Sequence, residues 1–264
     1  MPDSEILHKI LAAKREEVAA SKLRLPLSAL REQAEAMPPP RDFVAAIRAK
    51  HAVEKPAVIA EIKRASPSMG VFRPDFDAAA FARSYETNGA ACLSVLTDAA
   101  FFRGSAEDLK LARSACNLPV LRKDFMIDPY QIVESRAMGA DCILLISGAI
   151  PLSLAQEMES LAFSLGMAVL VESHNQDELL QALQLKTPLI GINNRDLKTF
   201  VVDLDVSRNL RKFVPDERIL VTESGINSKE DIVRMHQIGV STYLVGGAFM
   251  QSPDPGASLK EFLG

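Results

Sequence analysis

Charged side chains recur directly after apolar runs in this chain, in combinations that suit acid–base chemistry. Glu61 and Lys63 stand at the end of such a run, and both point to the same face because side chains of an extended chain alternate. Lys123 and Glu172 follow two later runs. A lysine near carboxylates can act as a general acid, and a glutamate on the opposite wall can accept a proton. We therefore predict a catalytic group of Lys63, Lys123 and Glu172, with Glu61 behind them.

Other residues at corresponding positions suit the binding of a flat, anionic molecule. Arg195 offers a guanidinium fork and Asn193 an amide, and both groups suit a substrate carboxylate. Phe102, Phe125 and Leu144 can form an apolar wall for a ring. We predict that these residues share one site with the lysines and glutamates.

Glycines after the last two apolar runs indicate an anion site. Glu223, Ser224 and Gly225 follow the first of these runs, and Gly246 and Gly247 follow the second. Glycine lets backbone N–H groups approach an anion closely, and a phosphate site at this place is common in barrels of alternating strands and helices. The sequence leaves room for a short helix after Gly247 that could complete the cradle.

Several of these features also have simpler interpretations. Glu61 and Lys63 could form a surface ion pair on an edge strand, and the glycines could be ordinary helix caps and turns. His174 could act as a base, but a lone histidine in a loop is more often a surface residue, and we leave it out of the predicted site. A surface interpretation is poor for the complete set of charged residues at these ends: Lys63, Lys123, Glu172, Arg195 and Glu223.

The elements that position these residues form a regular pattern of strand and helix. Apolar runs occur at 57–62, 91–96, 119–121, 142–146, 168–171, 189–192, 219–221 and 242–245. Amphipathic segments lie between them, among them 77–88, 129–138, 152–165 and 229–238. Eight such units predict an α/β fold, the (β/α)8 or TIM barrel, whose chemistry gathers at the carboxyl ends of the strands. A doubly wound open sheet is the rival, but the GxGxxG fingerprint of a dinucleotide-binding fold is missing.

The segment before the first strand has helical patterns and no strand. A helix capped by Asp3 or Ser4 would carry an apolar face that includes Ile10 and Val18, with Lys14 and its charged neighbours outside. Residues 27–36 and 42–47 suggest two more helices. We predict that residues 1–264 form a single (β/α)8-barrel domain, with residues 1–54 as a helical extension that covers one end of it.

Composition limits the class of protein. Of the 264 residues, 48% are hydrophobic and 24% are charged, as in an ordinary soluble globular protein. The net charge of −4 argues against a nucleic-acid partner, and no apolar run approaches membrane-spanning length. The three cysteines lack the spacing of a disulfide set or a metal site, and the chain starts without an export signal. We expect a cytoplasmic protein that binds neither nucleic acid nor membrane; the oligomeric state stays open, with a monomer favoured.

Four motifs together resemble the indole-3-glycerol phosphate synthase family of tryptophan biosynthesis. The first is IAEIKRASPS at 59–68, and the second combines LRKDF at 121–125 with DPYQ at 128–131. The third is GINNRDL at 191–197, and the fourth is TESG at 222–225. The resemblance extends from the N-terminal helix to the last strand, and the combination is far more specific than any single motif.

The resemblance implies a carboxy-lyase reaction. The substrate would be 1-(2-carboxyphenylamino)-1-deoxyribulose 5-phosphate, which closes a ring, loses CO2 and then loses water to give indole-3-glycerol phosphate. On the family pattern Lys123 is the general acid of ring closure and Glu172 the base of dehydration, with Glu61 as a competing candidate. Lys63 would contact the substrate carboxylate or phosphate and protonate the leaving hydroxyl. No metal and no organic cofactor is expected, because acid–base groups can carry every step.

The resemblance also assigns the remaining residues. Glu223 and Asn193 would complete the polar shell, and Ser66 and Arg195 would hold the carboxylate of the aromatic ring. The phosphate would face Ser224, Gly225, Gly246 and Gly247. Gly247 departs from the pattern, because many relatives have serine there; a hydroxyl contact would be lost while the backbone N–H remains.

Three other functions remain open from the sequence. A sugar isomerase of the tryptophan or histidine pathway would share the glycines, but it would lack the pairing of Glu-Ile-Lys with Lys-Asp-Phe. A barrel retained as a phosphate-ligand sensor would bind without turnover. An aldolase would form a Schiff base on Lys123 or Lys63.

Overall fold

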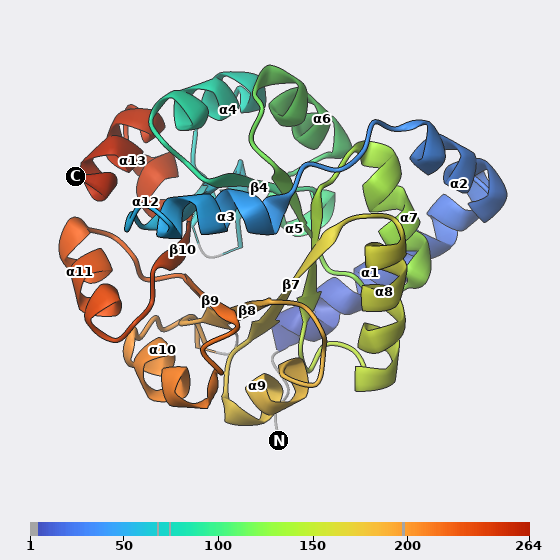
Figure 1. The fold of residues 1–264 in the computed structure, drawn as a ribbon. Coiled ribbons are helices and arrows are strands. Elements are labelled where there is room, and N and C mark those ends of the chain that lie inside the picture. The colour runs from blue at the N-terminus through green and yellow to red at the C-terminus, as the bar shows by residue number, and fades with distance from the viewer. Residues whose placement is uncertain (1–4, 68, 74, 197–198) are drawn as a thin grey trace.

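The computed structural model describes residues 5–67, 69–73, 75–196 and 199–264. Within these ranges eight strands close into a parallel barrel in the order β1-β10-β9-β8-β7-β6-β5-β4 (Figure 1). The strands are β1 (Ala57–Ile62), β4 (Cys92–Leu96), β5 (Val120–Lys123), β6 (Cys142–Ile146), β7 (Ala168–Ser173), β8 (Leu189–Asn193), β9 (Ile219–Glu223) and β10 (Thr242–Val245). The predicted barrel is confirmed, and the open-sheet alternative is wrong.

Helices alternate with these strands and surround the barrel (Figure 1). They are α4 (Ala78–Thr87), α6 (Ala106–Ala115), α7 (Pro129–Met138), α8 (Leu152–Ser164), α9 (Gln176–Ala182), α10 (Asp205–Leu210) with the 3-10 helix Arg211–Phe213, α11 (Lys229–Gln237) and α13 (Pro255–Leu263). In α7 the local signals are clear: Asp128 and Gln131 form a capping box, Pro129 takes the first turn, and Gly139 ends the helix with φ 93°. In the described part of the chain, no helix is long and apolar enough to span a bilayer.

Alternate side chains of each strand enter two different cores. In β1, Ala60 packs in the core between the barrel and its helices, whereas Ile59 packs in the core inside the barrel. Because side chains alternate, Glu61 and Lys63 follow Ile59 to the inner side, and both line the cavity there. Strand β1 pairs with β4 on one side and β10 on the other, so the edge-strand interpretation is wrong.

Short elements lie at the carboxyl ends of the strands. A hairpin of β2 (Ala65–Ser66) and β3 (Gly70–Val71) follows β1, and the four-residue α5 (Ala99–Phe102) follows β4. The short helix expected after Gly247 is α12 (Gly247–Gln251), directly after β10. These elements build the rim of the site described below.

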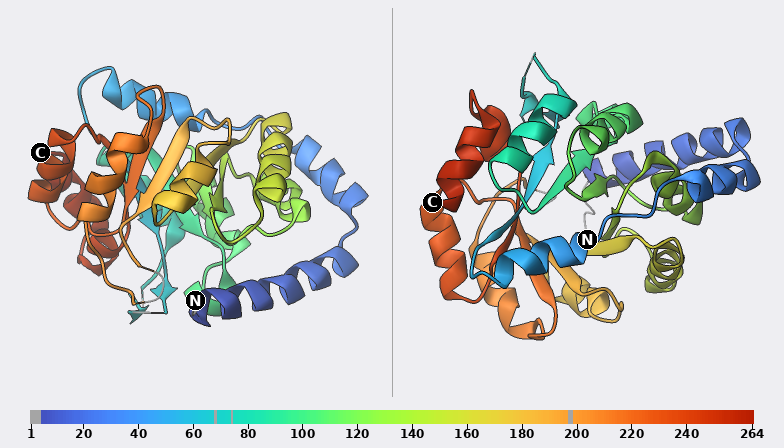
Figure 2. Two further views of the ribbon diagram at one scale, coloured as in Figure 1. Left: turned by 90° about the horizontal axis from the view of Figure 1, so that it is seen from below. Right: turned by 45° about the horizontal axis from the view of Figure 1, so that its top comes forward.

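The N-terminal segment covers both ends of the barrel, whereas the sequence predicted cover at one end. Helix α1 (Glu5–Arg24) places Ile6, Leu7 and Ile10 in the cavity at the carboxyl ends of the strands. Helix α3 (Phe43–His51) closes the opposite end, where Phe43 packs into the core inside the barrel. Helix α2 (Leu27–Ala36) packs on α7 at the side. Figure 2 shows α1 and α3 at opposite ends of the barrel. The predicted cap, Asp3 or Ser4, lies outside the described residues.

One prediction for α1 is wrong. Lys14 was expected among the exposed charges, but its side chain is only 1% exposed. Its Nζ lies 3.0 Å from Asp98 Oδ2 and 2.9 Å from Asp124 Oδ1, both beyond the ends of neighbouring strands. Burial disfavours the ammonium, but Asp124, Glu17 and Asp98 outweigh it and raise the pKa of Lys14. The helix is therefore fastened to the barrel by a buried ion cluster.

Candidate active site

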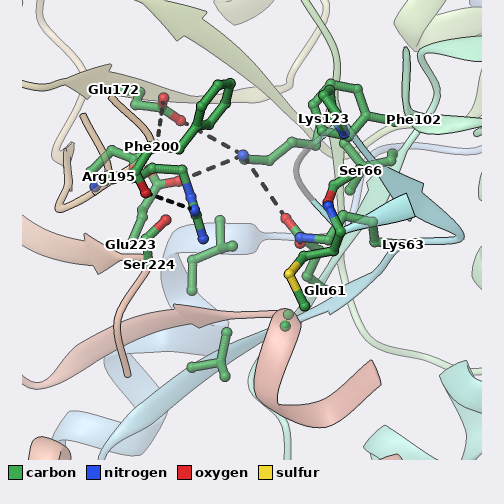
Figure 3. A pocket seen from close by; sticks show the side chains of 18 of the residues that line it. Glu61, Lys63, Ser66, Phe102, Lys123, Glu172, Arg195, Phe200, Glu223 and Ser224 are labelled. Carbon is green, nitrogen blue, oxygen red and sulfur yellow. Dashed lines mark hydrogen bonds and ion pairs between the residues drawn. The ribbon is translucent and has the colours of Figure 1, made fainter. Parts of the chain in front are cut away.

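A cavity of about 280 Å³ opens at the carboxyl ends of the barrel strands. All residues predicted to form the site line this cavity: Glu61, Lys63, Ser66, Phe102, Lys123, Phe125, Leu144, Glu172, Asn193, Arg195, Glu223, Ser224, Gly225, Gly246 and Gly247. They come from every strand of the barrel or from the segment that follows it. Figure 3 shows the charged members turned toward one another.

Lys123 lies at the centre of this group. Its Nζ lies 3.7 Å from Glu172 Oε2, 3.7 Å from Glu223 Oε2 and 3.9 Å from Glu61 Oε2, as the dashed lines in Figure 3 show. Burial disfavours the ammonium, but the three carboxylates outweigh it, so the pKa of Lys123 is raised above its ordinary value. Lys123 is therefore protonated at neutral pH. A Schiff base requires a free amine, so this environment argues against the aldolase alternative.

Lys63 and Glu61 form an ion pair at the mouth of β1. Burial alone would raise the pKa of Glu61, but the charges of Lys63 and Lys123 lower it below its usual range. The ammonium of Lys63 also lies 5.3 Å from the ring centre of Phe72, which follows the β2–β3 hairpin. Glu61 thus stays ionised between two lysines, and Lys63 is held where it faces the cavity.

Glu172 uses its two oxygens differently. Asn193 Nδ2 donates a 3.0 Å hydrogen bond to Oε1, and His174 Nε2 lies 3.1 Å from the same oxygen. Oε2 faces Lys123 and has no hydrogen-bond partner among the described residues. Burial raises the pKa of Glu172, but Lys123, His174 and Asn193 lower it strongly. A carboxylate with one oxygen anchored and the other free of hydrogen bonds to the described residues is suited to take a proton from a ligand.

His174 is not among the described residues that line the cavity, but the interpretation of it as a surface residue is wrong. Its side chain is only 10% exposed, and its second ring nitrogen, Nδ1, lies 2.9 Å from Glu178 Oε2. The sequence held a signal for this arrangement. His174 is two residues after Glu172, which places both on one side of an extended chain, and four residues before Glu178 at the start of a helix.

Glu223 differs from Glu172 although both lie equally far from Lys123. Neither carboxylate oxygen of Glu223 has a hydrogen-bond partner among the described residues. Burial and the neighbouring Glu172 raise the pKa of Glu223 well above its usual range, against the opposing charge of Lys123. Burial and Glu172 therefore favour the protonated form of Glu223, whereas Lys123, His174 and Asn193 favour the ionised form of Glu172.

The glycines at the ends of β9 and β10 do different things. A Cβ on Gly246 would lie 2.1 Å from Glu61 Oε1, so this position must be glycine for the carboxylate to fit. A Cβ on Gly247 would meet no atom of the described residues within 4 Å, and Gly247 lines the cavity at the start of α12. Ser224 and Gly225 turn the chain with φ values of 62° and 84°. Gly247 leaves space for an anion, Gly225 lies close to the side chains of Val202 and Leu204, and Gly246 makes room for Glu61.

Apolar side chains form the opposite wall. The rings of Phe102 and Phe125 lie 6.1 Å apart at an angle of 37°, and Leu144 of β6 lines the cavity with them. The sequence did not reveal that Phe200 and the first turns of α1 also line it, because helical periodicity shows an apolar face but not its partner. The wall suits an aromatic ring.

Arg195 and Ser66 lie on the rim between these walls. The Arg195 backbone N–H donates to Asn193 Oδ1 at 3.0 Å, and its guanidinium donates to the carbonyl of Phe200 at 3.2 Å (Figure 3). Ser66 Oγ accepts a hydrogen bond from the backbone of Met69 at 3.3 Å. A guanidinium with several further donors at a cavity rim suits a carboxylate.

Comparison with known structures shows the fold alone. The thiamine phosphate pyrophosphorylase from Pyrococcus furiosus superimposes with a TM-score of 0.59 at 17% identity, over 78% of this chain and 93% of that one. The structure of KGPDC from Streptococcus mutans gives a TM-score of 0.59 at 12% identity, over 79% and 96% of the two chains.

Sequence comparison is far more specific. The family described as indole-3-glycerol phosphate synthase matches residues 7–262. The protein of that name from Dechloromonas aromatica (strain RCB) is 59% identical over 97% of this chain and 98% of its own length. The one from Polaromonas naphthalenivorans (strain CJ2) is 58% identical over 99% of both chains. With its barrel, its cluster of lysines and glutamates and these relatives, the chain belongs to the indole-3-glycerol phosphate synthase family.

Proposed function

We propose that this protein is an indole-3-glycerol phosphate synthase of tryptophan biosynthesis. It converts 1-(2-carboxyphenylamino)-1-deoxyribulose 5-phosphate into indole-3-glycerol phosphate, CO2 and water. The observation that carries the proposal is the position of Lys123, within 3.9 Å of carboxylates from three different strands in the cavity of a chain of this family.

Substrate binding uses the two ends of the cavity. The phosphate lies against the open backbone at Gly247 and the turn at Ser224 and Gly225. The aromatic ring lies on Phe102 and Phe125, and its carboxylate faces Arg195 and Ser66 on the rim. This placement holds the ring carbon close to the ketone, which removes much of the entropy cost of ring closure.

Lys123 activates the ketone for ring closure. An ammonium with a raised pKa is a weak acid, so it first polarises the carbonyl through a hydrogen bond. The proton moves to the oxygen as negative charge builds there during carbon–carbon bond formation. The carboxylate of the ring then leaves as CO2, which restores the aromatic electron system.

Dehydration uses a second acid and a base. Lys63 protonates the hydroxyl, which leaves as water, and Glu172 accepts a proton from the neighbouring methylene carbon to complete the indole. Glu61 is the less suitable base, because its carboxylate is paired with Lys63 and packed against Gly246. Glu172 Oε2 has no hydrogen-bond partner among the described residues and lies beside Lys123. Glu223 and Asn193 complete the polar shell.

We also propose that residues 1–264 form one domain, which works as a monomer in the cytoplasm. Helix α3 shares its core with the barrel interior, which supports a single domain. The cysteines Cys92, Cys116 and Cys142 are all buried and free, in keeping with a reducing compartment. Size-exclusion chromatography with light scattering tests the monomer: a mass of two chains would refute it.

The function is tested by incubating the purified protein with the carboxyphenylamino deoxyribulose phosphate and following indole fluorescence. Mass spectrometry of the product and release of one CO2 per turnover confirm the reaction. Isomerase substrates of the same size serve as controls. If the protein turned over an isomerase substrate and formed no indole-3-glycerol phosphate, the proposed function would be wrong and the protein would be an isomerase.

A further inference from the structure

His174 lies behind the cavity, between two glutamates. It directly follows β7, with Nε2 at 3.1 Å from Glu172 Oε1 and Nδ1 at 2.9 Å from Glu178 Oε2 on α9. His174 is not among the described residues that line the cavity. It can therefore act on a substrate only through Glu172.

Glu178 is firmly anchored for this contact. Its Oε2 also accepts the backbone N–H of His174 at 2.8 Å, and its Oε1 accepts from Asn175 Nδ2 at 2.7 Å. Asn175 in turn caps α9 by accepting the backbone N–H of Glu178 at 3.0 Å. Each ring nitrogen of His174 thus faces a carboxylate oxygen, which is the surrounding of an imidazolium cation.

The charged groups around His174 and Glu172 determine which protonation state of each residue is favoured. Burial lowers the pKa of His174, but Glu172 and Glu178 outweigh it and raise the pKa to about 10. The ring is not well aligned for a hydrogen bond to Glu172 Oε1, so the interaction is mainly one of charge. The other charged groups that face Glu172 are Lys123 on β5 and Glu223 on β9, and Glu61 on β1 lies beyond Lys123.

Glu172 and Glu223 differ in the groups that surround their carboxyl groups on the side away from Lys123. Both Glu172 Oε2 and Glu223 Oε2 lie 3.7 Å from Lys123, so the lysine favours neither. Behind Glu172 stand the cationic His174 and the amide of Asn193. Behind Glu223 lies the backbone of Gly191, where a Cβ would be only 2.6 Å from Glu223 Oε1.

We propose that His174, held by Glu178, is a positioning residue that decides which of the two glutamates is ionised. It keeps Glu172 as the carboxylate, with Oε2 beside Lys123, and leaves the proton on Glu223. The proposal rests on the proposed function, in which Glu172 is the base of dehydration. Residues on the rim bind the substrate, and this residue behind the rim sets the charge of the base.

The first test does not depend on turnover. Nitrogen-15 spectra of histidine-labelled protein are recorded at about pH 8, where a free histidine with a pKa of about 6.5 is neutral. The His174→Gln variant assigns the signal. Two protonated ring nitrogens on His174 are the expected result. A neutral ring at this pH would overturn the proposal, whether or not the protein is a synthase.

The second test uses the pH dependence of dehydration in single turnovers. In His174→Gln the acid limb of the rate should move upward by about one pH unit or more, because Glu172 takes up a proton more readily. Glu178→Gln should shift it in the same direction by less, since the imidazolium loses one partner. His236→Gln, on the exposed face of α11, is the matched control and should keep the wild-type profile.

The outcomes separate this proposal from the function itself. An equal loss of rate at every pH in both variants would show that His174 only packs against its neighbours, and would overturn the proposal. A wild-type protein that forms no indole-3-glycerol phosphate would instead refute the proposed function. If His174→Gln does not fold, the wild-type spectrum and the Glu178→Gln profile decide.

Discussion

Gly246 and Gly247 are neighbours in the sequence but meet opposite surroundings. The position of the Glu61 carboxylate makes Gly246 indispensable, whereas Gly247 opens into the cavity. The sequence indicated glycines for an anion site, and it could not show that one of them serves a glutamate from the adjacent strand. That contact exists only because β1 and β10 pair in the closed barrel.

Substituting these two glycines by alanine separates their roles. Gly246→Ala should lower kcat by about a hundredfold or more, because Glu61 must leave its place beside Lys63 and Lys123. Gly247→Ala adds a methyl group to open space and should lower kcat less than tenfold, with its main effect on KM. Steady-state kinetics of both variants provide the measurement. Equal losses of kcat in the two variants would contradict the assignment.

Residue identities at the strand ends were predictable for a simple reason. Lys123, Glu172 and Glu223 each end an apolar strand, where a charge is unfavourable unless it serves the site. Lys14 and His174 were missed because their partners lie on other elements. Lys14 was predicted to lie outside the face of Ile10 and Val18, because only the fold supplies Asp98 and Asp124 to neutralise a lysine on that face.

Helix α1 is the element that joins the N-terminal segment to the chemistry. Lys14 reaches from α1 to Asp98, which caps α5 by accepting the backbone N–H groups of Phe101 and Phe102. It also reaches Asp124, the residue after Lys123, which pairs with Arg122 as well. The apolar wall and the central lysine are thus braced by a helix from outside the barrel.

Replacing Lys14 by methionine tests this brace. The change leaves the buried Asp98 without its cation and Asp124 with Arg122 alone, and removing one partner of a buried pair costs about 3–5 kcal/mol of the free energy of unfolding. Lys22→Met is the control on the same helix; its pair with Asp128 is half exposed and should contribute about 0–1 kcal/mol. Urea unfolding, with hydrogen exchange of α1, measures both. Similar losses in the two variants would refute a special role for Lys14.

At the scale of the whole molecule, the fold was readable from the sequence and the internal arrangement was not. Alternating apolar runs and amphipathic segments predicted the barrel, since few folds use that order. The N-terminal helices gave no such guide. Their apolar faces required a partner, but only the structure shows that α1 and α3 cover opposite ends of the barrel.

The pH dependence of the stability of the whole protein should include a contribution from Glu223. Its folded pKa is raised above the unfolded value of about 4.3, so its favourable contribution is complete below that value and is lost as the pH rises toward the folded pKa. Gln in its place has no proton to lose. The midpoint of thermal unfolding of Glu223→Gln minus that of the wild type should therefore grow as the pH increases from about 5 to about 9. A constant difference over this range would show that Glu223 does not change its charge.

The central claim is that Lys123 and Glu172 act on one molecule in two successive steps, and rapid-quench single turnovers test it most directly. With Lys123→Ala, the substrate should still bind but should remain unreacted, because the carbon–carbon bond cannot form. With Glu172→Gln, the ring-closed and decarboxylated intermediate should accumulate, because only dehydration is impaired. Lys110→Ala, on the outer helix α6, should form product at the wild-type rate. Product formation by Lys123→Ala at a rate close to that of the wild type would contradict the account, and so would Glu172→Gln without accumulated intermediate.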